Sequence, residues 1–327
     1  MPSTKNPVSS TAAGVALTGL IGALTPAYFV HQAVSRVRTG RREGATVPIE
    51  RVRLADRPLS EIMSQARPVI ITDLIDGIDF HHRPDVEGLR ALAAVTEGTF
   101  RVRTHRRHSP YFLYVGDYGA ELDGVEEMSL SEFVERMFVT GHEEDTCTYR
   151  LFSIKDLDGA IATMIDDIAD ALEPLTDRRP DRQASGVWIG SEGVVTPLHH
   201  DAWTGLLLQM DGSKRVAMFS PTDRPNLSFV SPFRPTERWS TLPARSTEAD
   251  AEEFPRLAHT IRHQAQLDAG EALFIPPYWS HEVEALEANV SIPFRFGTRP
   301  VDYVNPGFLR PAVEVFHGKY VAPRTSR

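Results

Sequence analysis

The chain has 327 residues, of which 41% are hydrophobic and 24% charged, and its formal net charge is −9 at pH 7. A chain of this length can bury a sizeable core, and we expect one large domain. The excess of acidic residues argues against a protein that binds nucleic acid, because such proteins need clustered Lys and Arg to displace counterions from phosphates. The single cysteine, Cys147, cannot form an internal disulfide, so we expect a reducing, cytoplasmic location.

The first 44 residues are predicted to form an apolar helix and a basic linker. No Asp, Glu, Lys or Arg occurs from Asn6 to Ser35, and the apolar run over residues 12–34 is long enough to span a bilayer. The four arginines from Arg36 to Arg42 would hold the following domain on the cytoplasmic side of any membrane. Glycines and Pro26 weaken such a helix in water. Three interpretations stay open, namely membrane association, a helix packed on the domain or on the partner of a homodimer, and disorder.

Residues 45–140 alternate between strand and helix signals, which predicts a mixed α/β region. A helix is expected to begin at Ser129, because Glu132 three positions later completes a capping box. The basic run over residues 101–108 could rim a substrate entrance that favours acidic partners, or it could form a solvated strand and turn. The other expected elements are strands at Val47–Val52, Arg67–Thr72 and Thr99–His105 and helices at Leu59–Gln65 and Asp85–Thr96.

Short β-branched and aromatic runs, interrupted by Gly, Pro and Asp, dominate the chain from about Thr146, with one helical stretch near Asp158–Leu172. They predict a mostly β fold with flanking helices around a double-stranded β-helix, or jelly-roll, core. Asp211-Gly212 and Ala269-Gly270 are expected to form tight turns. The expected strands are Tyr149–Ile154, Gly186–Ile189, Leu206–Met210, Arg215–Phe219, Ala272–Ile275 and Val290–Phe296.

Two histidines and one aspartate in this region form a candidate metal site. His199 and Asp201 are two residues apart, so on an extended chain both side chains point to the same face. His281 is expected at the end of an apolar strand. Two His and one carboxylate can hold iron and leave positions open for a chelating cosubstrate and O2. His200 offers an alternative register, but its carboxylate neighbour would then face the other way, so we expect His200 to point outward.

Four segments occur around these residues in a specific order, namely Gly186–Gly190, Thr196–Asp201, Asp211–Pro221 and Gly270–His281. In their order and spacing the chain resembles the Jumonji-C, cupin-like family of iron(II)- and 2-oxoglutarate-dependent oxygenases. It is most similar to the small hydroxylase branch that includes the asparaginyl hydroxylase of hypoxia-inducible factor. The resemblance is strongest over residues 186–296. It implies one catalytic domain at 45–310, with a barrel core at about 146–300 and a C-terminal tail at 311–327.

The resemblance also implies roles for individual residues. The two histidines and the aspartate named above would bind Fe(II), with no catalytic residue beyond these ligands. Lys214 would bind the distal carboxylate of 2-oxoglutarate, with Thr196 adding a hydrogen bond from its hydroxyl group. A cation and a hydroxyl suit a carboxylate at the closed end of a barrel. Tyr149 is a further candidate for the same contact, although it could equally pack inside the barrel.

The chain departs from the hydroxylase branch near the cosubstrate. Members of that branch often carry asparagines there, and the matching positions in this chain are Gly205 and Pro293. The contacts to the cosubstrate could therefore differ from those in that branch. Arg295 lies about where other 2-oxoglutarate oxygenases place a carboxylate-binding arginine. It could contact the cosubstrate or be a solvated strand residue.

The function implied by the resemblance is that of a dioxygenase. Such an enzyme uses Fe(II), 2-oxoglutarate and O2 to hydroxylate a protein side chain or a small molecule, and it releases succinate and CO2. A metal-binding cupin with 2-oxoglutarate-independent chemistry, such as ring cleavage or isomerisation, is the first alternative, but that chemistry has no need of Lys214. A non-catalytic metal-binding scaffold is the second, and the intact ligand set argues against it.

Overall fold

The computed structural model describes residues 43–80, 83–106, 124–140, 146–153, 160–181, 185–230, 238–243, 245–246, 249 and 252–297. The apolar run at 12–34, most of the basic linker and the tail at 311–327 lie outside these residues. Within the described part of the chain, no helix combines the length and the apolar character that crossing a bilayer requires.

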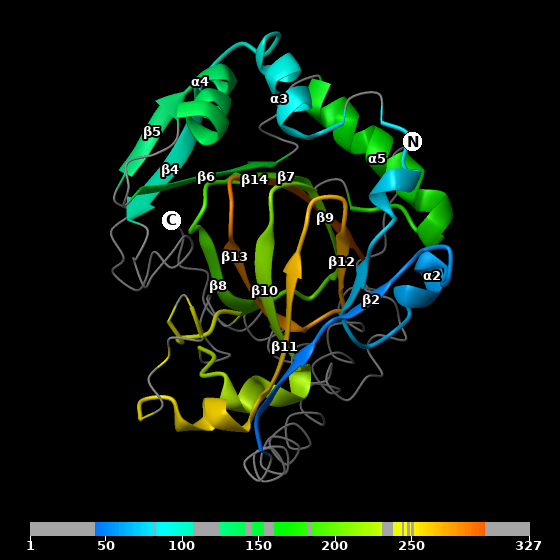
Figure 1. Cartoon of the computed structure of the whole chain (residues 1–327), viewed down its shortest axis with the longest axis vertical. Helices are drawn as coiled ribbons and strands as arrows, with labels where there is room; N and C mark the ends of the chain where they lie inside the picture. The colour runs from blue at the N-terminus through cyan, green and yellow to red at the C-terminus, as the bar shows by residue number, and fades with distance from the viewer. Residues whose placement is uncertain are drawn as a thin grey trace, which may run out of the picture.

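Figure 1 shows that strands dominate and that a few helices flank them. The helices are α2 (Leu59–Ile62), α3 (Val86–Ala93), α4 (Leu130–Glu135) and α5 (Ala160–Thr176), with shorter helical segments η1 (Ile75–Gly77), η2 (Arg136–Thr140), η4 (Pro221–Asn226) and η6 (Pro255–His259). The strands are β1 (Ala45–Pro48), β2 (Glu50–Val52), β3 (Val69–Ile71), β4 (Phe100–Arg106), β5 (Gly124–Met128), β6 (Thr146–Ser153), β7 (Gly186–Gly190), β8 (Val195–His200), β9 (Thr204–Asp211), β10 (Lys214–Phe219), β11 (Ile261–Leu267), β12 (Ala272–Ile275), β13 (Ser280–Ala285) and β14 (Asn289–Phe296).

The strands form two sheets that enclose the core of the domain (Figure 1). The smaller sheet has the order β1-β11-β10-β13-β8, and the larger has the order β2-β3-β12-β9-β14-β7-β6-β4-β5. From β8 to β14 the chain passes back and forth between the two sheets, except that β10 and β11 are consecutive antiparallel neighbours in the smaller sheet, and this arrangement is typical of a double-stranded β-helix. The predicted fold, mostly β with flanking helices and a jelly-roll core, is confirmed.

Successive residues of a strand enter different apolar layers. Leu207 of β9 points between the sheets, where it belongs to one cluster with Val216 of β10 and Leu273 of β12. Its neighbours Leu206 and Leu208 belong to the layer on the other face of the larger sheet. Because side chains alternate along a strand, a strand covered on both faces carries a continuous apolar run, which is what Leu206–Leu208 shows.

The helices cover the outer face of the larger sheet (Figure 1). Ile165, Ile168 and Leu172 of α5 are buried in the same cluster as Leu206 of β9 and Ile292 of β14. Ile168 follows Ile165 by three residues and Leu172 follows Ile168 by four, so the three side chains form one apolar stripe along the helix. The predicted helix near 158–172 is therefore present, and its described part runs on to residue 176.

The predicted start of α4 is also confirmed. The Ser129 side chain accepts a hydrogen bond from the Glu132 backbone N–H, and the Glu132 side chain accepts one from the Ser129 backbone N–H. Asp85 caps α3 in a similar way, because its side chain accepts the backbone N–H of Gly88. Such caps satisfy N–H groups that the first turn of a helix leaves without a helical partner.

Residues 45–52 join the two sheets at one edge of the barrel. The sequence predicted a single strand over Val47–Val52, and this was wrong, because Ile49 separates β1 in the smaller sheet from β2 in the larger sheet. The Ile49 side chain is buried in the cluster between the sheets. The chain changes sheets at this residue, so one continuous strand cannot form.

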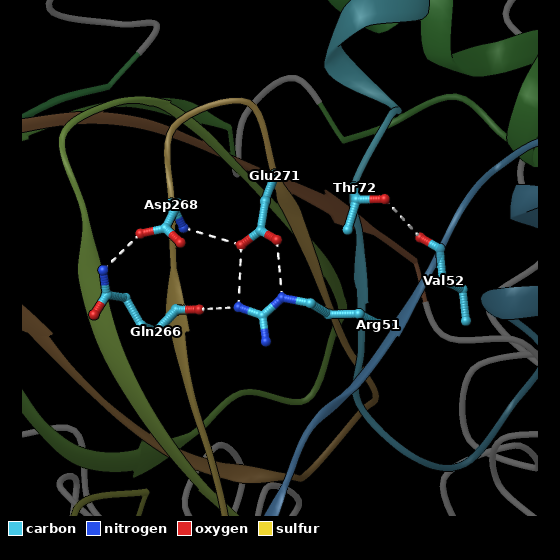
Figure 2. A network of polar contacts seen from close by, with 6 residues as sticks. All are labelled: Arg51, Val52, Thr72, Gln266, Asp268 and Glu271. Atoms are coloured by element: carbon cyan, nitrogen blue, oxygen red, sulfur yellow. Dashed lines mark hydrogen bonds and ion pairs between the residues drawn. The ribbon is translucent and has the colours of Figure 1, made fainter.

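An ion-pair network attaches β2 to the turn between β11 and β12 (Figure 2). Arg51 Nε donates to Glu271 Oε1 at 2.9 Å, and the same guanidinium donates to the carbonyl of Gln266. Glu271 also accepts the backbone N–H of Asp268 at 3.0 Å. The Arg51 side chain is 42% exposed, so this pair contributes at most about 1 kcal/mol. It adds a side-chain contact between β2 and this turn, whereas backbone pairing with β3 defines the register of β2.

Candidate metal centre

The two candidate histidine ligands lie on neighbouring antiparallel strands of the smaller sheet. His199 on β8 and His281 on β13 are register partners, and their ring centroids are 4.3 Å apart. Asp201 follows directly after β8, and ligating atoms of the three residues all lie within 4.8 Å of one another. The pairing of β8 with β13 thus unites two segments that are far apart in the sequence.

The placement of His281 differs from the one predicted. The apolar strand β12 ends at Ile275, and His281 is the second residue of the next strand, β13. Between them the chain turns through Tyr278, whose φ of 65° lies in the left-handed region that non-glycine residues rarely adopt. The Tyr278 backbone N–H donates to the carbonyl of Asp201 at 2.8 Å. This hydrogen bond connects the turn that precedes His281 to the backbone of a second candidate ligand.

Backbone carbonyls orient both candidate histidines. His199 Nδ1 lies 2.9 Å from the carbonyl oxygen of Pro197, and His281 Nδ1 lies 3.0 Å from that of Trp279. When Nδ1–H donates to a carbonyl, the lone pair of Nε2 remains for a metal. Burial lowers the pKa of both rings, and the neighbouring His281 lowers that of His199 further. Both imidazoles are therefore neutral at pH 7, as metal ligands must be.

Two arginines hold the carboxylate of Asp201. Arg238 Nη1 donates to Oδ1 at 2.8 Å, and Arg295 Nη2 donates to Oδ2 at 3.1 Å. Burial by itself would raise the pKa of Asp201, but the neighbouring Arg295, His199 and Arg238 outweigh it and hold that pKa well below its usual range. The carboxylate is therefore ionised at pH 7. Two neutral imidazoles and one carboxylate are a donor set that fits a divalent first-row metal such as Fe(II).

An aromatic side chain fixes the plane of the His199 ring. Trp239 stacks on His199 with ring centroids 4.4 Å apart and an interplanar angle of 23°. The backbones of the two residues also form an isolated β-bridge. The sequence did not predict Trp239 or Arg238 as parts of the site, because no motif or spacing connects them to the candidate ligands.

His200 points away from the candidate ligands but not into solvent. Its side chain is only 3% exposed. Arg224 Nη1 donates to His200 Nδ1 at 2.7 Å, and the rings of Phe229 and Tyr278 lie 5.4 and 5.9 Å from the imidazole. The segment after β10 covers this face of β8, which the alternation along a single strand could not reveal. The cluster able to hold a metal contains His199 and not His200.

A cavity opens beside the candidate ligands, between the two sheets. Besides the three ligands and Arg295 its lining is largely apolar. The lining residues are Trp188, Thr196, His199, Asp201, Trp203, Gly205, Leu206, Leu207, Ile275, His281, Val283, Pro293, Phe294 and Arg295. A smaller cavity shares Trp188, Thr196 and Val283 with the first and is also lined by Lys214. The two cavities therefore adjoin, and Lys214 lies at the end away from the ligands.

Lys214 is a buried cation. Its side chain is 5% exposed, and its Nζ donates to Ser291 Oγ at 2.6 Å. Burial lowers the pKa of Lys214 to about 7. Within the described part of the chain, no carboxylate forms an ion pair with it. Thr196, the hydroxyl residue expected beside it, is buried and lines both cavities.

The structure describes the other residues predicted near the cosubstrate or the substrate entrance to different extents. Tyr149 is described by its backbone alone, opposite Gly190 in the pairing of β6 with β7, and its side chain lies outside the described part. Gly205 and Pro293 both line the cavity beside the ligands. Gly205 pairs with Arg295 across β9 and β14, and a Cβ at position 205 would lie only 3.3 Å from the Ile275 side chain. Of the basic run at 101–108, residues 107 and 108 lie outside the described residues.

Comparison with known proteins identifies the family. Residues 55–300 match the family of cupin-like domains. HSPB1-associated protein 1 of Rattus norvegicus is 38% identical over 108 residues, which are 32% of this chain and 22% of that protein. Jumonji C domain-containing protein 5 of Drosophila melanogaster is 33% identical over 107 residues, 33% of this chain and 26% of that protein. Lysine-specific demethylase 8 of Xenopus tropicalis is 29% identical over 120 residues, 37% of this chain and 26% of that protein.

The individual matches and the family match differ in extent. The matched segments span only 22 to 26% of the length of these three relatives. The family match covers most of this chain and includes the three candidate ligands and Lys214. The chain therefore belongs to the cupin-like, Jumonji-C family.

Proposed function

We propose that the protein is an Fe(II)- and 2-oxoglutarate-dependent dioxygenase that hydroxylates its substrate. The observation that carries the proposal is Lys214, a buried cation in a small cavity that shares lining residues with the cavity beside the candidate metal ligands. Burying an ammonium group without a counter-charge is costly. A bound dicarboxylate would remove that cost through a charge-assisted hydrogen bond. A cupin that uses no keto acid has no need of a cation at this position.

The residues around the cavities would hold the two ends of the cosubstrate. Lys214 and the hydroxyl of Thr196 would bind the distal carboxylate, because both line the smaller cavity. The keto-acid end would then lie beside His199, Asp201 and His281, a ligand set that leaves positions open on an octahedral ion. The apolar residues between these two ends would exclude water from the reaction.

The overall reaction balances without an acid–base pair. Bound iron supplies the activation of O2, which protein side chains cannot provide. One oxygen atom would enter succinate as 2-oxoglutarate loses CO2, and the other would convert a substrate C–H bond to C–OH. The keto acid and the C–H bond each supply two of the four electrons that O2 accepts. The chain contributes binding, orientation and a dry cavity.

We propose protein side chains as the first class of substrate to test, with small molecules as the second. The name of one relative associates it with the protein HSPB1, and that of another makes it a lysine demethylase. Both names refer to proteins as partners or substrates. Demethylation by this chemistry would begin with hydroxylation of a methyl C–H bond. Mass spectrometry distinguishes the two outcomes, because hydroxylation adds one oxygen atom and demethylation removes a methyl group.

A binding experiment without turnover tests the proposal most directly. Calorimetric titration would use Mn(II) as a redox-stable substitute for Fe(II) and N-oxalylglycine as an unreactive analogue of 2-oxoglutarate. We expect the wild type to bind N-oxalylglycine only with Mn(II) present, His199→Ala to bind neither, and Lys214→Met to bind Mn(II) alone. A wild type that binds Mn(II) but not N-oxalylglycine would refute the 2-oxoglutarate dependence. Succinate formation with Fe(II) then measures turnover.

A further inference from the structure

Two guanidinium groups converge on Asp201 from different parts of the fold. Arg295 stands on β14 of the larger sheet, opposite Gly205, whereas Arg238 belongs to the segment beside β8 of the smaller sheet. Each donates to a different carboxylate oxygen, at 3.1 and 2.8 Å respectively. One negative charge therefore faces two positive charges at the candidate metal centre.

The backbone holds Arg238 in place while its side chain remains accessible. The His200 backbone N–H donates to the carbonyl of Arg238 at 3.1 Å, and the next residue, Trp239, pairs with His199. The Arg238 guanidinium also lies 5.2 Å from the centroid of the Trp239 ring, a cation–π distance. The side chain is nevertheless 43% exposed. A guanidinium has five N–H donors, so Arg238 can contact Asp201 and a further acceptor together.

Positive charge would remain in excess at the candidate metal centre even after a divalent metal and 2-oxoglutarate have bound. Asp201 is the only acidic residue among the described residues that line the cavity beside the ligands. A divalent ion brings two positive charges, and 2-oxoglutarate brings two negative ones. When the negative charge of Asp201 and the positive charges of Arg238, Arg295 and Lys214 are counted with these, a surplus of two positive charges results. In a partly dry cavity such a surplus favours an anionic ligand strongly.

We propose that the substrate carries a carboxylate that Arg238 binds, together with Arg295, beside Asp201. The inference rests on the function proposed above and specifies its substrate class. Guanidinium groups match carboxylates in geometry and in charge. Because both arginines contact a candidate metal ligand, the C–H bond to be oxidised lies within a few bonds of the carboxylate. Trp203, which is 38% exposed and lines the same cavity, provides an apolar surface for the rest of the substrate.

Two probes of equal shape and different charge test this inference. N-acetyl-aspartate amide and N-acetyl-asparagine amide would be titrated into the wild type saturated with Mn(II) and N-oxalylglycine. Binding is detected by the change in the Mn(II) electron paramagnetic resonance spectrum and by calorimetry, so no turnover is required. We expect the acidic probe to bind at least about tenfold more tightly, as a charge-assisted hydrogen bond implies.

The variant that tests the residue assignment is Arg238→Gln, with Arg215→Gln as its matched control. Arg215 pairs with Glu284 at 2.7 Å on β10, and its side chain is 49% exposed. Its ion-pair partner is therefore Glu284, whereas that of Arg238 is the candidate metal ligand Asp201. We expect Arg238→Gln to bind the two probes within about threefold of each other, because the charged contact is lost. Arg215→Gln should keep the full preference for the acidic probe.

The outcomes separate this inference from the proposed function. If N-oxalylglycine and Mn(II) bind but the wild type does not prefer the acidic probe, or binds neither probe, the anionic substrate is refuted and the proposed function stands. If Arg238→Gln retains the preference of the wild type, Arg238 is not the anion-binding residue. If the wild type fails to bind N-oxalylglycine, the proposed function itself is refuted.

Discussion

The ammonium group of Lys214 lies 2.6 Å from Ser291 Oγ inside the barrel, where burial lowers the pKa of the lysine to about 7. The pKa of a lysine in an unfolded chain is close to 10.5. Between these two pH values the unfolded chain binds more protons than the folded chain, so the free energy of unfolding increases as pH rises. Below pH 7 both states are protonated and the whole cost of burying the charge is present. That cost is at most roughly 5 kcal/mol.

Replacing Lys214 with methionine should remove this pH dependence. The Lys214→Met variant should be more stable than the wild type at neutral pH without cosubstrate, because the buried charge is gone and the methionine fills a similar volume. The advantage should shrink toward pH 10, where the wild-type lysine is neutral. Denaturant unfolding of both proteins at neutral pH and near pH 10 measures the difference in their free energies of unfolding. Titratable groups that the two proteins share contribute equally to both values and cancel in this difference. An advantage that does not change with pH would contradict the prediction.

A divalent metal should stabilise the folded protein through the three candidate ligands. Free Mn(II) at a hundredfold excess over its Kd should raise the free energy of unfolding by about 2.7 kcal/mol, and a chelator should reverse the effect. His199→Ala and His281→Ala should abolish this stabilisation. His259→Ala, on η6, is the control and should retain it. Equal stabilisation of wild type and His199→Ala would show that the metal binds elsewhere.

Trp239 should affect metal affinity through the orientation of His199. Trp239→Ala removes the stacked ring and should weaken Mn(II) binding by about tenfold or more, as changes to groups that support metal ligands typically do. Trp239→Phe retains an aromatic face and should keep most of the affinity. Mn(II) titration of the folded variants measures the effect. If Trp239→Ala is less stable to heat but binds Mn(II) as tightly as the wild type, Trp239 contributes to packing and not to metal binding.

His200 should contribute to stability and not to metal binding. His200→Ala leaves the buried guanidinium of Arg224 without the acceptor that it has at 2.7 Å, which should cost about 1 to 3 kcal/mol. Mn(II) affinity should stay within about threefold of the wild type, because the ring points away from the ligand cluster. If His200→Ala lost as much metal binding as His199→Ala, the assignment of His199 in place of His200 as the metal ligand would be contradicted.

The sequence alone determined the features that depend on local pattern. Apolar runs with turn residues between them predicted the jelly-roll, and Ser129 with Glu132 predicted the start of α4, because strands and helix caps are encoded within a few residues. The two-residue spacing of His199 and Asp201 predicted a shared face for the same reason. Strands β5 and β8 were not among the expected strands, and neither were β11 and β13. Polar residues such as Gln264 and Glu282 interrupt them, and they are extended because neighbouring strands pair with them.

Only the tertiary structure decided which distant residues complete the site. His281 faces His199 because β13 pairs with β8, and the turn through Tyr278 sets that register. Arg238 reaches Asp201 because its segment lies against β8, a contact that no periodicity records. His200 is buried for the same reason. Strand periodicity specifies the face on which a side chain lies, whereas pairing between segments distant in sequence determines what covers that face.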